Sequence, residues 1–187
     1  MQKIHPKRRW IAVLPNTLTG LRLAMAVAFP ILPGSWRGPV VLAAGLSDSA
    51  DGLLARRFRV TSLLGGHFDA VTDKAFVLSV VITFAVSGSL SLWQAALLLA
   101  RDGVVAAIVA YAVLTRRWDA FRKMPARRWG KLTTAALFVL FVVMIFWPNA
   151  EIAVQNLFVV SAGLSAVAGF DYAFQFIVAY RADRQRD

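Results

Sequence analysis

The chain has 187 residues, of which 58% are hydrophobic, 21 are basic and 10 are acidic, and it contains no cysteine. The lack of cysteine excludes disulfide frameworks and thiolate catalysis, and the apolar content is too high for a soluble domain of this size. A net charge of +11 on such an apolar chain indicates membrane orientation and anionic lipid headgroups as partners, and no nucleic acid is expected.

The N-terminal segment, residues 1–14, combines four basic side chains with a short apolar run that contains Trp10. This mixture is typical of an amphipathic juxtamembrane segment in the headgroup layer. A secretory signal is the competing interpretation, but the polar stretch from Pro15 to Thr19 interrupts its apolar core.

Six apolar segments follow, close to the length of about 17–25 residues that a membrane-spanning helix needs. They are Thr17–Leu32, Gly38–Arg57, Leu64–Val86, Leu90–Leu114, Gly130–Trp147 and Ile152–Tyr180. Pro39 suits the first turn of the second helix. No repeat or linker divides the chain. We therefore expect an all-α integral membrane protein, one domain over residues 1–187 with a six-helix bundle over residues 17–180.

The basic side chains predict how this bundle is oriented. Seventeen of the 21 fall within residues 3–9, 56–59, 116–131 and 181–186, whereas the opposite connections hold only Arg37. By the positive-inside rule both termini are cytoplasmic, as are the helix ends nearest the acidic residues. The expected location is the inner (cytoplasmic) membrane, with the site facing the cytoplasm.

Four carboxylates interrupt the second and third apolar segments: Asp48, Asp51, Asp69 and Asp73. The first two are three residues apart and the last two four apart, so each pair shares one face of its helix. Any one of these aspartates alone would be interpreted as a helix or loop cap. Charges in such a place cost at least a few kcal/mol unless they find partners, and two Mg²⁺ or Mn²⁺ ions would relieve their mutual repulsion.

Other charged residues lie inside the predicted spans. At the start of the first span, helix capping by Asn16 or Thr17 with Arg22 as a snorkelling side chain is one interpretation, and a binding role for this segment is the alternative. Arg101 and Asp102 are neighbours in the fourth span, so each is expected to have a different partner, because adjacent side chains on a helix do not face each other. Arg101 either pairs with another helix or meets substrate. Asp171 could pair with Arg101 or Arg22.

The most basic connection, residues 116–131, has two interpretations. Solvated charge beside lipid headgroups is the default. A few of these side chains could instead bind a phosphorylated acceptor, because arginine and lysine are the usual phosphate partners.

The acidic region reads D-x-x-D-G-x-x-A-R from Asp48 to Arg56, followed by Gly65, Asp69 and Asp73. This pattern resembles the signature of the CDP-alcohol phosphatidyltransferases, with every fixed position filled. Two further segments resemble that family. They are the P-N-x-L-T start at residues 15–19 and the G-K-x-x-T segment at residues 130–134, the latter typical of its glycerophosphate 3-phosphatidyltransferase branch.

The resemblance implies transfer of a phosphatidyl group from CDP-diacylglycerol to an acceptor alcohol, release of CMP, two Mg²⁺ or Mn²⁺ ions and a homodimer. It assigns Asp48, Asp51 and Asp69 to the metals, and Asp73 to a metal contact and the catalytic base. The implied nucleotide contacts are Asn16, Thr19, Gly52, Arg56 and Ser62. The candidates for binding the acceptor phosphate are Lys131, Arg127 and Arg101.

Two departures from the branch pattern bear on the acceptor. The branch usually has proline after the third aspartate and glutamine after the G-K-x-x-T segment, where this chain has Ala70 and Ala135. Glycerol 3-phosphate is the expected acceptor, and phosphatidylglycerol or inositol phosphate remain open.

Two other classes of protein also place acids in membranes. Membrane prenyltransferases have their two aspartate motifs on well-separated helices of a longer chain. An ion-coupled transporter would not need Gly52 and Arg56, and the chain shows no matching halves.

Overall fold

The structure is a computed structural model that describes residues 17, 19–58, 63–115 and 128–184, with side chains except at 48–58, 63–70, 128 and 182–184. Within these residues every regular element is helical, which confirms the predicted all-α class. The chain forms two compact units, Met1–Leu90 and Ser91–Asp187, and each is described by itself.

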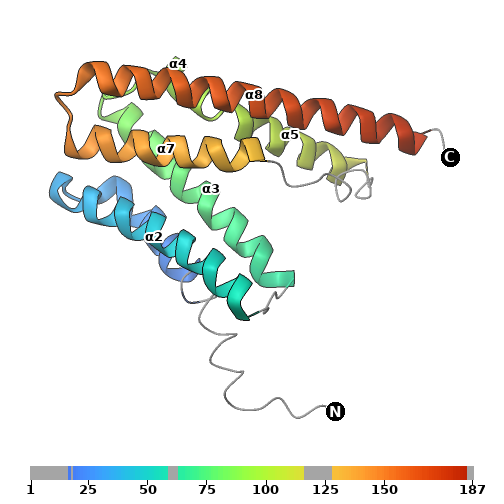
Figure 1. Ribbon diagram of the computed structural model, residues 1–187, viewed down its shortest axis with the longest axis horizontal. Coiled ribbons are helices and arrows are strands. Elements are labelled where there is room, and N and C mark those ends of the chain that lie inside the picture. Colours follow the sequence, from blue (N-terminus) through green and yellow to red (C-terminus); the bar gives the residue numbers. More distant parts are fainter. Residues whose placement is uncertain (1–16, 18, 59–62, 116–127, 185–187) are drawn as a thin grey trace, which may run out of the picture. The chain divides into compact units, whose positions relative to one another are not determined.

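The first unit consists of three helical stretches. An apolar helix, Thr19–Ile31, ends in the 3-10 turn η1 (Phe29–Ile31). Then follow α2 (Gly34–Phe58) and α3 (Leu63–Val86), drawn from blue to green in Figure 1. Gly88 follows α3 with a φ of 77°, a conformation that favours glycine, and the Leu90 amide donates to the Phe84 carbonyl at 3.1 Å.

The start of α2 differs from the prediction. The helix begins at Gly34, so the expectation that Pro39 lies in its first turn is wrong. The Trp36 amide already donates to the Pro33 carbonyl at 3.0 Å, which starts the helical path more than a turn earlier. Because proline lacks an N–H group, Pro39 removes one hydrogen bond to the preceding turn, and the helix continues past it.

The second unit is built around its last helix. It contains α4 (Leu92–Leu98), α5 (Ala100–Leu114), α7 (Arg128–Phe146) and α8 (Glu151–Arg184). The other three helices all pack against α8, and α5 and α7 lie along its length in Figure 1. At about 1.5 Å per residue, α8 is longer than the roughly 30 Å hydrocarbon core of a bilayer.

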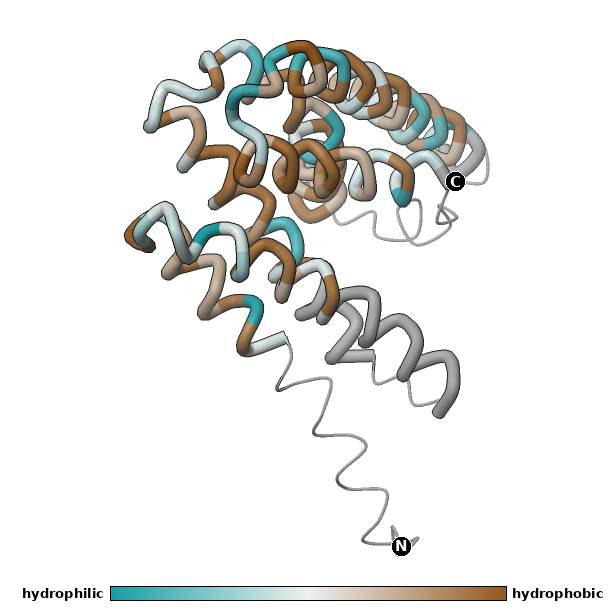
Figure 2. The backbone as a smooth tube through the Cα atoms, turned by 60° about the vertical axis from the view of Figure 1, so that its left-hand side comes forward, coloured by the Kyte–Doolittle hydropathy of each residue, from teal (hydrophilic) through white to brown (hydrophobic). Residues whose placement is uncertain are grey.

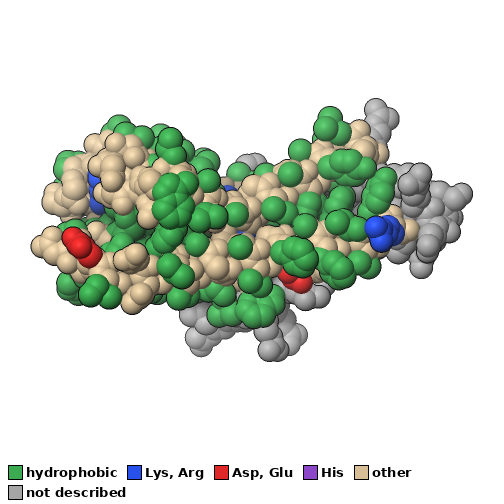
Figure 3. Space-filling model, turned by 90° about the horizontal axis from the view of Figure 1, so that it is seen from above, with side chains coloured by type: hydrophobic (Ala, Val, Ile, Leu, Met, Phe, Trp, Pro, Cys, Tyr) green, Lys and Arg blue, Asp and Glu red, His purple; other side chains and the backbone are tan. Residues whose placement is uncertain are grey.

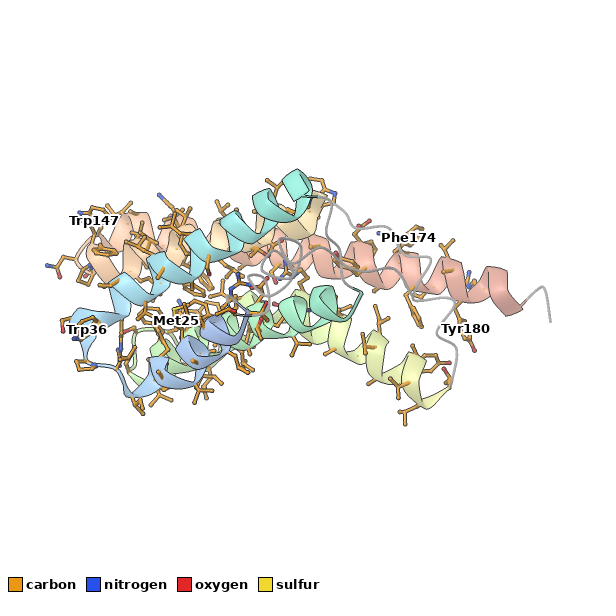
Figure 4. The ribbon with its side chains drawn as sticks, turned by 90° about the horizontal axis from the view of Figure 1, so that it is seen from below. Met25, Trp36, Trp147, Phe174 and Tyr180 are labelled. Atoms are coloured by element: carbon orange, nitrogen blue, oxygen red, sulfur yellow. The ribbon has the colours of Figure 1, made fainter. Side chains whose placement is uncertain are left out.

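Among the described residues, two helices are long and apolar enough to cross a membrane, Trp129–Phe146 and Glu151–Arg181, and a third candidate is α4 with α5 if that bent pair counts as one span. Hydrophobic residues dominate these helices in Figure 2, and the face seen in Figure 3 carries few charged side chains. Trp36 near the start of α2 and Trp147 just after α7 are each 60% exposed (Figure 4). Aromatic residues in such positions are typical of membrane interfaces.

The fourth predicted span, Leu90–Leu114, is not one straight helix. It bends by 62° between α4 and α5, at Leu99. Ser165 of α8 lies against this break: its hydroxyl donates to the Leu98 carbonyl at 2.9 Å and accepts from the Arg101 amide at 3.1 Å. A hydroxyl from another helix thus satisfies backbone groups that the break frees, as a broken helix in an apolar environment requires.

Small residues of α8 allow this close approach. Ser165 and Ala168 are fully buried, and a Cβ atom on Gly169 would lie 3.4 Å from the Arg101 Cα. Small side chains at helix contacts let the two backbones approach closely. Such close packing holds helices together in a membrane, where the hydrophobic effect does not drive them to associate. The face of α8 near residues 165–169 is therefore fitted to the first turn of α5.

Ser165→Ala is expected to lower the unfolding free energy by about 1–3 kcal/mol, because it leaves two backbone groups at the break without their partner. Ser161, one turn earlier and also fully buried, is the matched control, since its hydroxyl has no hydrogen-bond partner among the described residues. Ser161→Ala should be neutral or stabilising. Thermal unfolding of the purified protein in detergent measures both, and equal effects would contradict the capping role of Ser165.

Candidate active site

The two aspartate pairs lie on consecutive helices, as predicted. Asp48 and Asp51 are on α2, and Asp69 and Asp73 are on α3. The side chains of the first three lie outside the described part of the structure, as do those of Gly52 and Arg56, and Ser62 and Asn16 lie outside the described residues. Among the described side chains no group of three potential metal-ligating residues is present. The metal and nucleotide assignments therefore stay predictions.

Asp73 is the one predicted metal ligand whose side chain is described. Its carboxylate oxygen Oδ1 accepts from the Arg22 guanidinium nitrogen Nη1, which forms an ion pair. The Arg22 side chain is only 2% exposed, whereas that of Asp73 is 35% exposed. The arginine is thus enclosed by protein, whereas the carboxylate is partly exposed.

The same guanidinium also reaches α2. Its Nη2 donates to the Ser47 hydroxyl at 3.4 Å, and that hydroxyl donates to the Ala44 carbonyl at 2.8 Å. Ser47 directly precedes Asp48 and lies one turn before Asp51. Arg22 therefore joins the first helix, α2 and α3 at the level of both aspartate pairs.

Further contacts hold the first helix against α3. The Ser79 hydroxyl donates to the Ala26 carbonyl at 2.6 Å, and the rings of Phe29 and Phe76 meet edge to face with centroids 5.9 Å apart. Phe29 is completely buried. These contacts lie on one stripe of each helix, in line with the Arg22–Asp73 pair, so the first helix packs along α3. Thr19, a predicted nucleotide contact, is buried in the first turn of this helix.

The interpretation of Arg22 as a snorkelling side chain is wrong. It is 1% exposed and bound between helices, because Asp73 of α3 offers its charge a partner within the protein. Sequence reasoning left Arg22 out of the site. The available signal was that Arg22 is the only charged residue between Arg9 and Arg37, in a chain whose acidic region needs countercharge.

In the second unit, Arg101 ties the first turn of α5 to the first turn of α7. Its Nη1 donates to the Gly130 carbonyl at 2.7 Å and to the Thr134 hydroxyl at 3.2 Å. Its Nη2 donates to Asp102 Oδ1 at 3.0 Å. The expectation that Arg101 and Asp102 have different partners is therefore wrong: the arginine side chain is long enough to fold back onto the adjacent carboxylate while it reaches α7.

The predicted acceptor-phosphate residues are only partly described. Lys131 lies exposed on α7, next to Gly130, and Arg127 lies outside the described residues. The Arg101 guanidinium is engaged by Asp102 and by the start of α7. The Asp171 carboxylate accepts a hydrogen bond from the side-chain amide nitrogen of Gln175 at 2.8 Å. Whether these basic residues bind a phosphate stays a prediction.

In the part of the chain that the structure describes, the protein is helical throughout its regular elements and has helices of membrane-spanning length. A family model described as CDP-alcohol phosphatidyltransferase matches residues 12–168. The chain belongs to the CDP-alcohol phosphatidyltransferase family, which confirms the resemblance carried by its aspartates.

Relatives with three different names are similar to this chain. A CDP-diacylglycerol–glycerol-3-phosphate 3-phosphatidyltransferase of Pectobacterium atrosepticum is 32% identical over 91% of this chain and 96% of its own length. A probable phosphatidylglycerophosphate synthase of Mycobacterium tuberculosis is 30% identical over 88% and 82%. A putative cardiolipin synthase of the same organism is 32% identical over 57% of this chain, and the match spans 53% of that relative's length.

The close approach of α7 to α8 at Gly130 gives a test of the second unit. A Cβ atom there would lie 3.1 Å from the Tyr172 hydroxyl, so Gly130→Ala is expected to lower the unfolding free energy by about 1 kcal/mol. In a Tyr172→Phe background the next atoms are 3.9 Å away, and the same substitution should no longer destabilise.

Gly163→Ala is the control, because a Cβ there meets nothing within 4 Å. The melting temperatures of Gly130→Ala, Tyr172→Phe, the double variant and Gly163→Ala are compared by thermal unfolding. Equal destabilisation by Gly130→Ala with and without the Tyr172 hydroxyl would contradict this packing.

Proposed function

We propose that this protein transfers the phosphatidyl group of CDP-diacylglycerol to glycerol 3-phosphate, releasing CMP and forming phosphatidylglycerol phosphate. The observation that carries the proposal is the match to a relative of that name over nearly the whole of both chains. Family membership favours this transferase over a prenyltransferase or an ion-coupled transporter.

A second acceptor has specific support. The similarity to a putative cardiolipin synthase covers only part of both chains, but at 32% its identity equals that of the glycerophosphate relative. Phosphatidylglycerol as acceptor would give cardiolipin by the same chemistry. The two candidates differ in the alcohol and share the CDP-lipid.

The donor set fits two divalent cations. Asp48, Asp51, Asp69 and Asp73 supply only oxygen ligands, which Mg²⁺ and Mn²⁺ prefer. The Arg22 contacts to Ser47 and Asp73 support the convergence of α2 and α3 at this level. When bound, such ions supply positive charge that stabilises the diphosphate and the departing CMP.

The chain's own residues then have separate tasks. Asp73 accepts the proton of the acceptor hydroxyl, whose oxygen attacks the lipid-side phosphorus while the bond from that phosphorus to the CMP oxygen breaks. Gly52, Arg56, Ser62, Asn16 and Thr19 hold the nucleotide. Lys131, with Arg127 and Arg101, would bind the acceptor phosphate. Exclusion of bulk water from this site would limit hydrolysis of the CDP-lipid.

The proposed setting is the inner (cytoplasmic) membrane. Six crossings with both termini in the cytoplasm agree with the distribution of basic residues along the sequence. The active site then faces the cytoplasm just below the headgroups, where CDP-diacylglycerol enters from the bilayer. By family resemblance the protein forms a homodimer.

CMP release by the purified protein in lipid vesicles tests the reaction. With CDP-diacylglycerol and Mg²⁺, glycerol 3-phosphate should give the fastest release in a panel with phosphatidylglycerol, inositol phosphate and serine. Asp73→Asn should lower kcat at least about 10²-fold because the proton acceptor is lost. Glu151→Gln, which removes an exposed carboxylate of the second unit, is the control. CMP release by Asp73→Asn at the wild-type rate would refute the role of Asp73.

Chelation tests the cation requirement separately. Excess EDTA should abolish CMP release, because converging carboxylates then face the diphosphate without countercharge. Added Mg²⁺ or Mn²⁺ should restore it, whereas Na⁺ at equal ionic strength should not. Undiminished turnover in EDTA would show that the four aspartates serve another purpose.

A further inference from the structure

The Arg22 side chain makes directed contacts with two different helices. One guanidinium nitrogen binds Oδ1 of Asp73 on α3, and another binds the Ser47 hydroxyl on α2. The fork of an arginine is planar and rigid, so two anchored nitrogens fix its plane. A carboxylate held against such a plane by one oxygen has a defined direction for the other.

Packing of the first helix does not by itself require this arginine. The Ser79–Ala26 hydrogen bond and the Phe29–Phe76 contact already join the first helix to α3. A buried ion pair often contributes no more stability than apolar side chains of similar volume, because both charges lose their hydration. A charged residue enclosed to 1% exposure is thus better explained by what it does to its partner.

We propose that Arg22 is a positioning residue for Asp73. It holds the carboxylate through Oδ1, which fixes the direction of that group, and it keeps one positive charge beside the proposed cation site. This inference rests on the proposed function, since it gives Asp73 its role as proton acceptor and cation ligand. Arg22 acts through Asp73 and needs no contact with the substrate.

The proposal predicts effects of opposite sign on cation binding and on turnover. Removing the positive charge next to a ligand should tighten Mn²⁺ binding, on the order of ten-fold. Loss of the fixed carboxylate direction should lower kcat, on the order of 10²-fold, because small misplacements of a reacting group have effects of that size. A merely structural defect would instead weaken both.

The experiment compares Arg22→Gln, Arg22→Lys and Ser79→Ala with the wild-type chain. Mn²⁺ binding is measured without substrate by electron paramagnetic resonance, and kcat and KM by CMP release. Ser79→Ala is the matched control, because it removes a hydrogen bond between the same two helices without touching Asp73. It should lower the melting temperature and leave Mn²⁺ affinity and kcat unchanged.

Arg22→Gln should bind Mn²⁺ more tightly and turn over more slowly, with little change in the KM for CDP-diacylglycerol. Arg22→Lys keeps the charge but not the two-pronged geometry. It should therefore keep the wild-type Mn²⁺ affinity and show an intermediate kcat. Weaker Mn²⁺ binding by Arg22→Gln, or a wild-type kcat in either variant, overturns the proposal. If Arg22→Gln does not fold, Arg22→Lys decides alone.

Failure of the proposed function has a different signature. Wild-type protein that binds Mn²⁺ but releases no CMP with any acceptor would refute the transferase. The Mn²⁺ comparison among the variants would still decide whether Arg22 acts on Asp73. Wild-type protein that binds no Mn²⁺ would overturn both.

Discussion

The ion pair between Arg22 and Asp73 constrains the first unit more than any apolar contact does. An enclosed guanidinium without a counterion costs several kcal/mol, so the Arg22–Asp73 pair has to form wherever the first helix packs along α3 with Arg22 enclosed. Hydrophobic contacts such as Phe29 against Phe76 tolerate small sliding, whereas a directed ion pair does not. The second bond, to Ser47, extends this constraint to α2. One side chain thus contributes to the register of three helices.

The second unit also has polar groups that need partners inside the protein, at the bend between α4 and α5. The 62° bend between α4 and α5 interrupts the regular hydrogen bonding of an apolar region, and Ser165 and Arg101 both lie beside it. Arg101 is held by its neighbour Asp102 and by the Gly130 carbonyl, so its charge has partners within the protein. In both units an arginine joins helices that are distant in sequence. In both, small or hydroxyl-bearing residues allow the close approach.

The sequence predicted the helices well and the partners of its charged residues poorly. Long apolar runs mark helices whatever their neighbours, which is why α3, α7 and α8 begin and end within a few residues of the predicted segments. The start of α2 was predicted too late because Pro39 was placed in the first turn. Proline is tolerated inside this helix, which loses only one hydrogen bond there. The bend at Leu99 has no local signal, since its stabilising hydroxyl is supplied by Ser165, 66 residues later in the chain.

In the candidate site, too, the sequence predicted local features but not contacts between distant residues. Spacing alone predicted that the four aspartates form two helix-borne pairs, because helical periodicity is local. The pairing of Asp73 with Arg22 could be seen only in the fold, since the two lie 51 residues apart and the sequence had suggested Asp171 as a possible partner of Arg22.

The balance of charge in the proposed site gives a reason for this pairing. In the proposed site four carboxylates and the two charges of a diphosphate face two divalent cations, Arg22 and Arg56, so negative and positive charges are equal in number. Without Arg22 the proposed loaded site would keep one uncompensated negative charge, so the proposal gives the buried guanidinium a part in the electrostatics of the reaction as well as in the packing of the helices.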